Sequence, residues 1–315
     1  MVWLQSYGVE ATWVAQDLDP GGMLYRVHNK LVNVPGQNYA HGPALAAKIQ
    51  EQIQGSSLPP IHTAYVQHIE EKEQFFNIKL SSKEGKYTQT LQARTILLAT
   101  GTRYGNLQLT KKQTPSPHIT NMDSAYFSSS ASRDGAEVKH KTVAVIGGGD
   151  AAFENAITLA QKHNCHIHLL MRSKPKARRK FVQQVIALKD HITVWPIPTT
   201  TEGATPHEDH VTLHLTCKDE PHDLDVSCAF IRIGVRPVYP NTQGFELETN
   251  ASGYICVDQH QRTSNPRIFA AGDITATPMQ SIVTSASEAA KAALSIAQEL
   301  GAYTLTEDEL STLLG

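Results

Sequence analysis

Short apolar runs alternate with amphipathic stretches along most of the chain, a pattern typical of strands and helices in turn. Residues 141–146 read Lys-Thr-Val-Ala-Val-Ile, a β-branched run that predicts a buried strand. Glycines follow at once, and a helical stretch then reaches from about Asp150 to Gln161. A second apolar run at 166–170 lies at the distance that a β-α-β unit requires. The pattern predicts an α/β fold with a parallel sheet.

The turn between the first strand and the helix has the spacing G-x-G-x-x-A. In such a turn the first glycine allows a tight bend, the second lets the backbone approach a pyrophosphate, and the small last residue permits close helix packing. The phosphate lies at the helix N-terminus, where free N–H groups and the helix dipole stabilise it. The predicted dinucleotide-binding residues are Gly147, Gly148, Gly149, Asp150, Ala151 and Ala152.

A basic segment follows the strand at 166–170, where an NAD-specific site usually carries an acidic residue. Basic side chains bind a 2'-phosphate through charge-assisted hydrogen bonds, so the segment favours NADPH over NADH. The alternatives are a solvated basic loop and a nucleic-acid patch, and the second is disfavoured because no aromatic residues are interspersed with the charges. The predicted binders are Arg172, Ser173, Lys174 and Arg178.

Two further predicted strands, at 94–98 and 267–270, each end in a turn of small residues. The second turn carries an aspartate and precedes a helix rich in Ala and Ser. An aspartate beside a helix N-terminus suits a ribityl hydroxyl and the negative charge that develops on a flavin ring. The residues assigned to this second nucleotide site are Ala99, Thr100, Gly101, Gly272, Asp273, Gln280 and Ser281.

Composition mainly excludes classes of function. The 315 residues carry 28 basic and 30 acidic side chains, a net charge of -2, which provides no strong field for nucleic acid or an anionic membrane. No stretch approaches the roughly 18 apolar residues that a membrane-spanning helix needs, and no signal-peptide pattern opens the sequence, so we expect a cytoplasmic protein. The four cysteines form no C-x-x-C motif, so we expect buried, reduced thiols and no metal site.

The motifs occur in the order and spacing of the low-molecular-weight thioredoxin reductases, and the sequence resembles that family essentially end to end. Residues 21–24 and 32–36 are similar to its GGQL and ENWPG segments, residues 147–154 to GGGDxAxE, and residues 269–273 to FAAGD. The resemblance implies two Rossmann-like, three-layer dinucleotide-binding domains, the cofactors FAD and NADPH, and a homodimer. The further cofactor-binding residues that we assign are Asp17, Gly21, Gly22, Asn33 and Gly234.

The resemblance also implies a discontinuous flavin domain. Its two parts are residues 1–117 and 241–315, and the NAD(P)H-binding domain, residues 118–240, is inserted between them. Hinges are expected near 114–117 and 234–237, where Pro and Gly interrupt the pattern. Rotation about these hinges is expected to bring nicotinamide to flavin.

Two departures from the family pattern limit the chemistry. A first flavin-domain strand with its own G-x-G-x-x-G is expected before Leu4, so we expect an upstream start, or weakened flavin binding with low stability. The family's redox dithiol, C-A-T-C-D-G, falls on residues 130–135, which read Ser-Ala-Ser-Arg-Asp-Gly. A dithiol acts because one thiolate attacks a disulphide and its neighbour resolves the mixed disulphide, and serine does neither.

We expect residues 128–132 to form a mobile polar loop rather than a serine nucleophile. The catalytic candidate is Asp134, which either delivers a proton near the flavin or simply makes an Asp-Gly turn. The predicted reaction is hydride transfer from NADPH to flavin and electron delivery to an external acceptor, such as a ferredoxin-like protein or a small disulphide. The alternatives are ferredoxin–NADP reductase-like electron transfer and a non-catalytic nucleotide-binding remnant.

Overall fold

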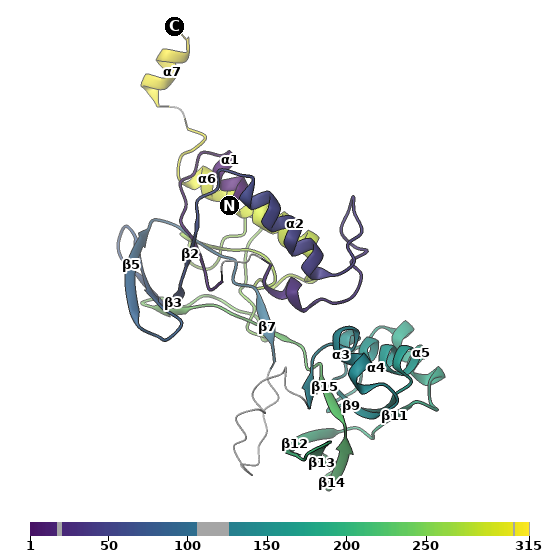
Figure 1. Ribbon diagram of the computed structural model, residues 1–315. Helices are drawn as coiled ribbons and strands as arrows, with labels where there is room; N and C mark the ends of the chain where they lie inside the picture. Colours follow the sequence, from purple (N-terminus) through teal and green to yellow (C-terminus); the bar gives the residue numbers. More distant parts are fainter. Residues whose placement is uncertain (18–20, 106–125, 305, 315) are drawn as a thin grey trace. The chain divides into compact units, whose positions relative to one another are not determined.

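The chain folds into two compact units, one of which is inserted into the other (Figure 1). The computed structural model describes residues 1–17, 21–105, 126–304 and 306–314. The first unit comprises Met1–Arg103 and Arg236–Gly315, and the second comprises Tyr104–Val235. The sequence places the boundaries at 117/118, which lies outside the described residues, and at 240/241.

The inserted unit has three layers around a five-stranded parallel sheet of order β11-β10-β9-β15-β8. The strands are β8 (Phe127–Ser128), β9 (Thr142–Ile146), β10 (His166–Leu170), β11 (Ile192–Val194) and β15 (Cys228–Ile231). Val143 and Val145 of β9 pack in the core beneath the helices, whereas Ala144 and Ile146 pack with a second sheet. The central strands are therefore buried on both faces, which explains their continuous apolar sequence.

Helices form one outer layer of this unit and an antiparallel sheet forms the other. The helices are α3 (Ala131–Asp134), η2 (Gly135–Val138), α4 (Asp150–His163) and α5 (Arg179–Ala187). The antiparallel strands are β12 (Thr199–Pro206), β13 (Val211–Cys217) and β14 (Glu220–Val226). The helix predicted to end near Gln161 continues for a few residues, until Asn164 in the left-handed conformation ends it.

The first unit contains two separate parallel strand pairs and a four-stranded sheet of order β17-β3-β4-β5. The paired strands are β1 (Trp13–Ala15) with β2 (Ile61–Thr63), and β18 (Ile268–Ala270) with β6 (Ile96–Leu98). The larger sheet contains β3 (Tyr65–Glu71), β4 (Phe76–Ser81), β5 (Tyr87–Ala93) and β17 (Asn241–Gln243). Among the described residues, no strand joins the two parallel pairs into one sheet.

Helices of the first unit come from both ends of the chain. They are α1 (Val2–Ser6), η1 (Gly22–Arg26), α2 (Gly42–Gln54), α6 (Ile282–Glu299) and α7 (Glu307–Leu314). Leu4 of α1 packs in one core cluster with Phe269 of β18 and Ile296 of α6. This apolar contact holds α1 beside α6.

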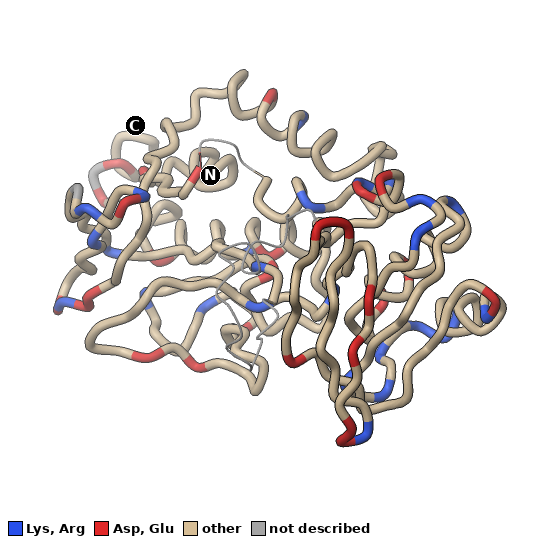
Figure 2. Tube along the Cα trace, turned by 60° about the horizontal axis from the view of Figure 1, so that its bottom comes forward, with Lys and Arg blue, Asp and Glu red and all other residues tan. Residues whose placement is uncertain are grey.

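Where the chain passes between the units, β7 (Thr102–Tyr104) pairs with β16 (Val235–Pro237). Basic and acidic positions are interspersed along the trace (Figure 2). Within the described chain, no helix is both long enough and apolar enough to cross a membrane.

Candidate active site

The predicted nucleotide turn joins β9 to α4 in the inserted unit. Gly147 has φ of +144°, and a Cβ on it would lie 2.2 Å from the carbonyl oxygen of Arg232. Its N–H donates to the carbonyl of Leu170 at 3.0 Å. Ala152 is fully buried in the core beneath α4. The turn thus requires glycine at its start and a small residue at its end, as a backbone that approaches a pyrophosphate does.

The basic segment is fixed against this turn by three hydrogen bonds or ion pairs. The N–H of Lys176 donates to the carbonyl of Gly148 at 2.7 Å. Arg178 donates its backbone N–H to Asp150 at 2.7 Å, and its Nε lies 2.6 Å from the second carboxylate oxygen. The guanidinium also lies over the ring of Phe181, 4.7 Å from the centroid. The structure thereby brings together the two predicted halves of the NADPH site.

The basic segment leaves its other predicted binders open to solvent. Arg172, Ser173 and Lys174 are all exposed. Long basic side chains at such positions are free to form charge-assisted hydrogen bonds with a phosphate. The residues present therefore fit a dinucleotide that carries a 2'-phosphate.

Residues 128–131 are buried, and the exposed Ser132 lies in helix α3, so the prediction of a mobile polar loop over residues 128–132 is wrong. Ser128 and Ser129 are each 2% exposed, and Ser130 is 7% exposed. Ser130 caps α3, since its hydroxyl accepts from the N–H of Arg133 at 3.3 Å. The polarity of the run suggested a loop, but its hydroxyls and amides find partners inside the fold.

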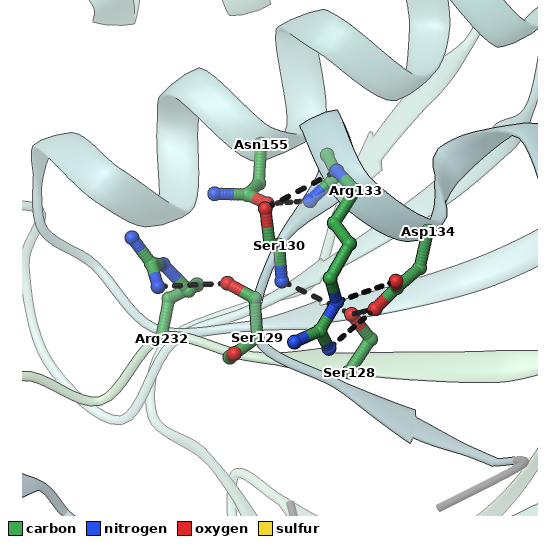
Figure 3. A network of polar contacts seen from close by, with 8 residues as sticks. Ser128, Ser129, Ser130, Arg133, Asp134, Asn155 and Arg232 are labelled. Carbon is green, nitrogen blue, oxygen red and sulfur yellow. Dashed lines mark hydrogen bonds and ion pairs between the residues drawn. The ribbon is translucent and has the colours of Figure 1, made fainter. Parts of the chain in front are cut away.

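Asp134, the catalytic candidate, lies at the centre of this network (Figure 3). Its carboxylate accepts from the Ser128 hydroxyl at 2.5 Å and pairs with Arg133 through Nε at 2.6 Å and Nη2 at 2.7 Å. The bidentate pair fixes the carboxylate in place. Neither the proton-delivery role nor the turn role of Asp134 is tested by this geometry, and both stay predictions.

Two further residues, Asn155 and Arg232, hold the serine-rich segment, and neither is among the site residues predicted from the sequence. The carbonyl oxygen of Asn155 accepts from the N–H of Ala131 at 2.5 Å, while its amide donates to Ala151 at 2.7 Å. Nη1 of Arg232 donates to the carbonyl of Ser129 at 2.7 Å (Figure 3). In the sequence, Asn155 stands out as a polar residue on the apolar face of α4, whereas no pattern points to Arg232.

The cysteines are free thiols, as predicted. Three of them are buried, and Cys256 is partly exposed. Burial, with smaller contributions from the charges of Asp134 and Glu137, raises the pKa of Cys228 to about 12. This thiol is therefore protonated at neutral pH and is a poor nucleophile.

Four of the predicted flavin residues of the first unit, Gly272, Asp273, Gln280 and Ser281, lie between β18 and the start of α6. Gln280 donates to the carbonyl of Asp273 at 3.0 Å, and Ser285 donates to its carboxylate at 3.3 Å. Burial raises the pKa of the Asp273 carboxyl; the Ser285 hydrogen bond opposes this and the charge of Glu288 adds to it. Ser281 caps α6, accepting from the N–H of Thr284 at 3.1 Å.

Glu288 supports the turn after β18 and is not among the site residues predicted from the sequence. It is 7% exposed and accepts from the N–H of Gly272 at 2.8 Å and the hydroxyl of Thr275 at 2.9 Å. A buried carboxylate on α6 thus holds the turn that presents Asp273.

The remaining predicted residues lie on separate turns. Gly101 has φ of +64°, and its carbonyl accepts from the N–H of Val238 at 3.0 Å. Thr100 donates to the carbonyl of the same Val238. The others are Ala99, exposed after β6; Asp17, exposed after β1; Gly21 and Gly22, at the start of η1; Asn33, exposed between Leu31 and Tyr39; and Gly234, with φ of +92°.

The turn that presents Asp273 in the first unit fits the ribityl part of FAD. A partly buried Asp273 with a raised pKa, next to the capped N-terminus of α6, suits a ribityl hydroxyl. In the described part of this unit, no strand passes through a glycine turn directly into an α-helix, which is the usual pyrophosphate site.

A family model described as pyridine nucleotide-disulphide oxidoreductase matches residues 27–293. The chain belongs to this family. The match confirms the predicted class of NAD(P)H-dependent flavoprotein oxidoreductase, and thioredoxin reductase-like members of the family use FAD and NADPH.

The chain is similar in sequence to proteins named thioredoxin reductase and NADH dehydrogenase. A thioredoxin reductase of Ureaplasma parvum is 31% identical over 284 residues, which cover 87% of this chain and 84% of that protein. An NADH dehydrogenase of Bacillus subtilis is 30% identical over 257 residues, or 80% of this chain. The chain spans about half the length of such relatives, 47% in this case and 48% for an NADH dehydrogenase of Ferdinandcohnia aciditolerans.

A solved structure confirms the predicted fold of two dinucleotide-binding domains. The crystal structure of Lactococcus lactis thioredoxin reductase in its FR conformation matches with a TM-score of 0.75 and covers 96% of this chain and 94% of its own. The two sequences are 22% identical, so this likeness concerns the fold alone.

Proposed function

We propose that this protein is an NADPH-dependent flavoprotein oxidoreductase whose electron acceptor is a separate molecule. The observation that carries the proposal is that the residues at the two cysteine positions of the family's dithiol, Ser130 and Arg133, have structural roles. Ser130 caps α3 and Arg133 pairs with Asp134, so both side chains have structural tasks and neither has redox chemistry. Electrons therefore need an acceptor from outside the chain.

The nucleotide half of the proposal is supported by the inserted unit. The turn at Gly147 would hold the pyrophosphate, and Arg178 with the exposed Arg172 and Lys174 would hold the 2'-phosphate. FAD, when bound, accepts a hydride from the reduced nicotinamide and releases its electrons singly or in pairs. The turn that presents Asp273 would hold the ribityl chain.

The acceptor classes that we propose are a ferredoxin-like protein and a small disulphide. A thioredoxin is disfavoured as a direct acceptor because the chain has no vicinal dithiol to form the mixed disulphide. We keep the cytoplasm and the homodimer as part of the proposal.

NADPH oxidation by the chain with added FAD tests the proposal. Ferredoxin, a small disulphide and thioredoxin are supplied in turn under anaerobic conditions, and oxygen is tested separately in air. Oxidation that requires ferredoxin or the small disulphide is the expected result. The double variant Ser130→Cys/Arg133→Cys is the matched comparison, because it restores the C-x-x-C spacing. Thioredoxin reduction by the unchanged chain would overturn the proposal.

A non-catalytic nucleotide-binding module is the second candidate. It is favoured by the first unit, whose described residues contain no glycine turn of the usual pyrophosphate type. NADPH binding without any flavin absorbance or NADPH oxidation, in the presence of added FAD, would support this candidate instead.

A further inference from the structure

Arg232 lies immediately after β15, at the carboxyl edge of the parallel sheet. Its N–H donates to Ile146 at 2.8 Å, and its carbonyl oxygen lies against Gly147. In open α/β sheets a dinucleotide lies across the carboxyl ends of the strands where the strand order reverses. In the order β11-β10-β9-β15-β8 that point lies between β9 and β15. Arg232 therefore flanks the point on one side, and the basic segment that follows β10 flanks it on the other.

The guanidinium of Arg232 is anchored through one nitrogen. Nη1 donates to Ser129 at 2.7 Å and to the hydroxyl of Tyr104 at 3.1 Å. The central carbon lies 5.2 Å from the centre of the Tyr104 ring. Together these contacts fix the plane of the group, because a guanidinium and an aromatic ring attract when the charge lies over the ring face.

The other edge of the guanidinium is unused. Nε is buried and has no hydrogen-bond partner, and within the described chain Nη2 has none either. No carboxylate of the described residues pairs with this cation. Nε and Nη2 form the side of the fork that binds a planar acceptor with two parallel N–H groups. Buried donors without partners are rare in folded proteins, and such a position calls for a ligand.

We infer that Arg232 positions the nicotinamide ring by donating to its carboxamide oxygen. The inference rests on the proposed function, which assigns the pyrophosphate to the Gly147 turn and the adenosine phosphate to the side of Arg178. The nicotinamide half then extends over β15, toward the unused edge of Arg232. A carboxamide oxygen is the planar acceptor that this edge fits.

Binding measurements on the full chain separate this role from a structural one. Calorimetry compares 1,4,5,6-tetrahydro-NADP, an unreactive analogue with a neutral carboxamide ring, with adenosine 2',5'-bisphosphate, which lacks the nicotinamide half. Arg232→Gln is expected to weaken the binding of tetrahydro-NADP roughly tenfold and that of adenosine 2',5'-bisphosphate less than about twofold. Arg232→Lys keeps the positive charge but not the two parallel N–H groups, and it is expected to weaken the binding of tetrahydro-NADP by a similar factor.

A second measurement needs no variant. The nicotinic acid analogue of NADP⁺ has a carboxylate in place of the carboxamide, and the unchanged chain is expected to bind it roughly tenfold more tightly than NADP⁺, because a carboxylate pairs with the guanidinium. Arg232→Gln is expected to abolish that preference. Equal loss of both ligands in the variants, or no carboxylate preference in the unchanged chain, would overturn the inference. Failure of the unchanged chain to bind even adenosine 2',5'-bisphosphate would instead overturn the proposed function on which it rests.

Discussion

Asp150 and Arg178 form a two-point contact at the N-terminus of α4: the Asp150 carboxylate accepts the backbone N–H of Arg178 at 2.7 Å and lies 2.6 Å from its Nε. The two side chains are 41% and 72% exposed, so the pair contributes little to stability. Its effect is on placement, because it holds a basic residue beside a turn built for phosphate.

Arg178→Gln is expected to weaken NADP⁺ binding about 10-fold to 100-fold, the range for a lost hydrogen bond to a charged group, and to leave NAD⁺ binding within about twofold. Calorimetric titration of both nucleotides measures this. Arg179→Gln is the matched control, since Arg179 is an exposed neighbour at the start of α5. An equal loss for both nucleotides would show that Arg178 does not read the 2'-phosphate.

Asn155→Ala is expected to lower the free energy of unfolding by about 1–3 kcal/mol, because it leaves the N–H of the buried Ala131 without a partner. Urea unfolding followed by circular dichroism measures the loss. Gln161→Ala, at an exposed position of the same helix, should change stability by less than about 0.5 kcal/mol. Equal effects of the two substitutions would mean that Asn155 does not hold the serine-rich segment.

Glu288→Ala is expected to lower the free energy of unfolding by about 1–3 kcal/mol, since it removes the acceptor for the part-buried N–H of Gly272 and the buried hydroxyl of Thr275. Glu288→Gln keeps one acceptor oxygen and should cost less. Thermal unfolding ranks the two variants, and Lys291→Ala on the exposed side of α6 serves as the control. A larger loss for Gln than for Ala would contradict the role assigned to the carboxylate.

Asp273→Asn is expected to stabilise the flavin-free chain at neutral pH. The pKa of Asp273 is raised in the folded state, so the folded chain holds the proton more tightly than the unfolded chain does. The free energy of unfolding therefore falls as the pH rises from 3.8, the usual pKa, to the raised pKa of the folded chain. Above the raised pKa, the ionised carboxylate destabilises the folded chain by its full amount. The difference in melting temperature between variant and parent should shrink as the pH is lowered through this window. A difference that does not depend on pH would show that the carboxyl has an ordinary pKa.

Local sequence determined the elements whose partners lie close along the chain. The run 142–146, the glycines that follow and α4 form the predicted strand, turn and helix, because glycine geometry and apolar periodicity act over neighbouring residues. The helix start at Thr306 is of the same kind: its hydroxyl accepts from the N–H of Glu309 at 3.2 Å, while Glu309 accepts from the N–H of Thr306 at 2.8 Å.

Only the tertiary structure decided what replaces the dithiol. A run of serines is polar, and the sequence by itself indicates a solvated loop. In the fold, Asn155 reaches Ala131 from 24 positions away, and Arg232 reaches Ser129 from 103 positions away. Such contacts depend on which strands become neighbours in the sheet, and no local pattern encodes that. The sequence therefore shows that the redox pair is absent, whereas the packing of β8 beside β15 shows that a hydrogen-bonded network occupies its place, in which Ser130 is buried and Arg133 is exposed.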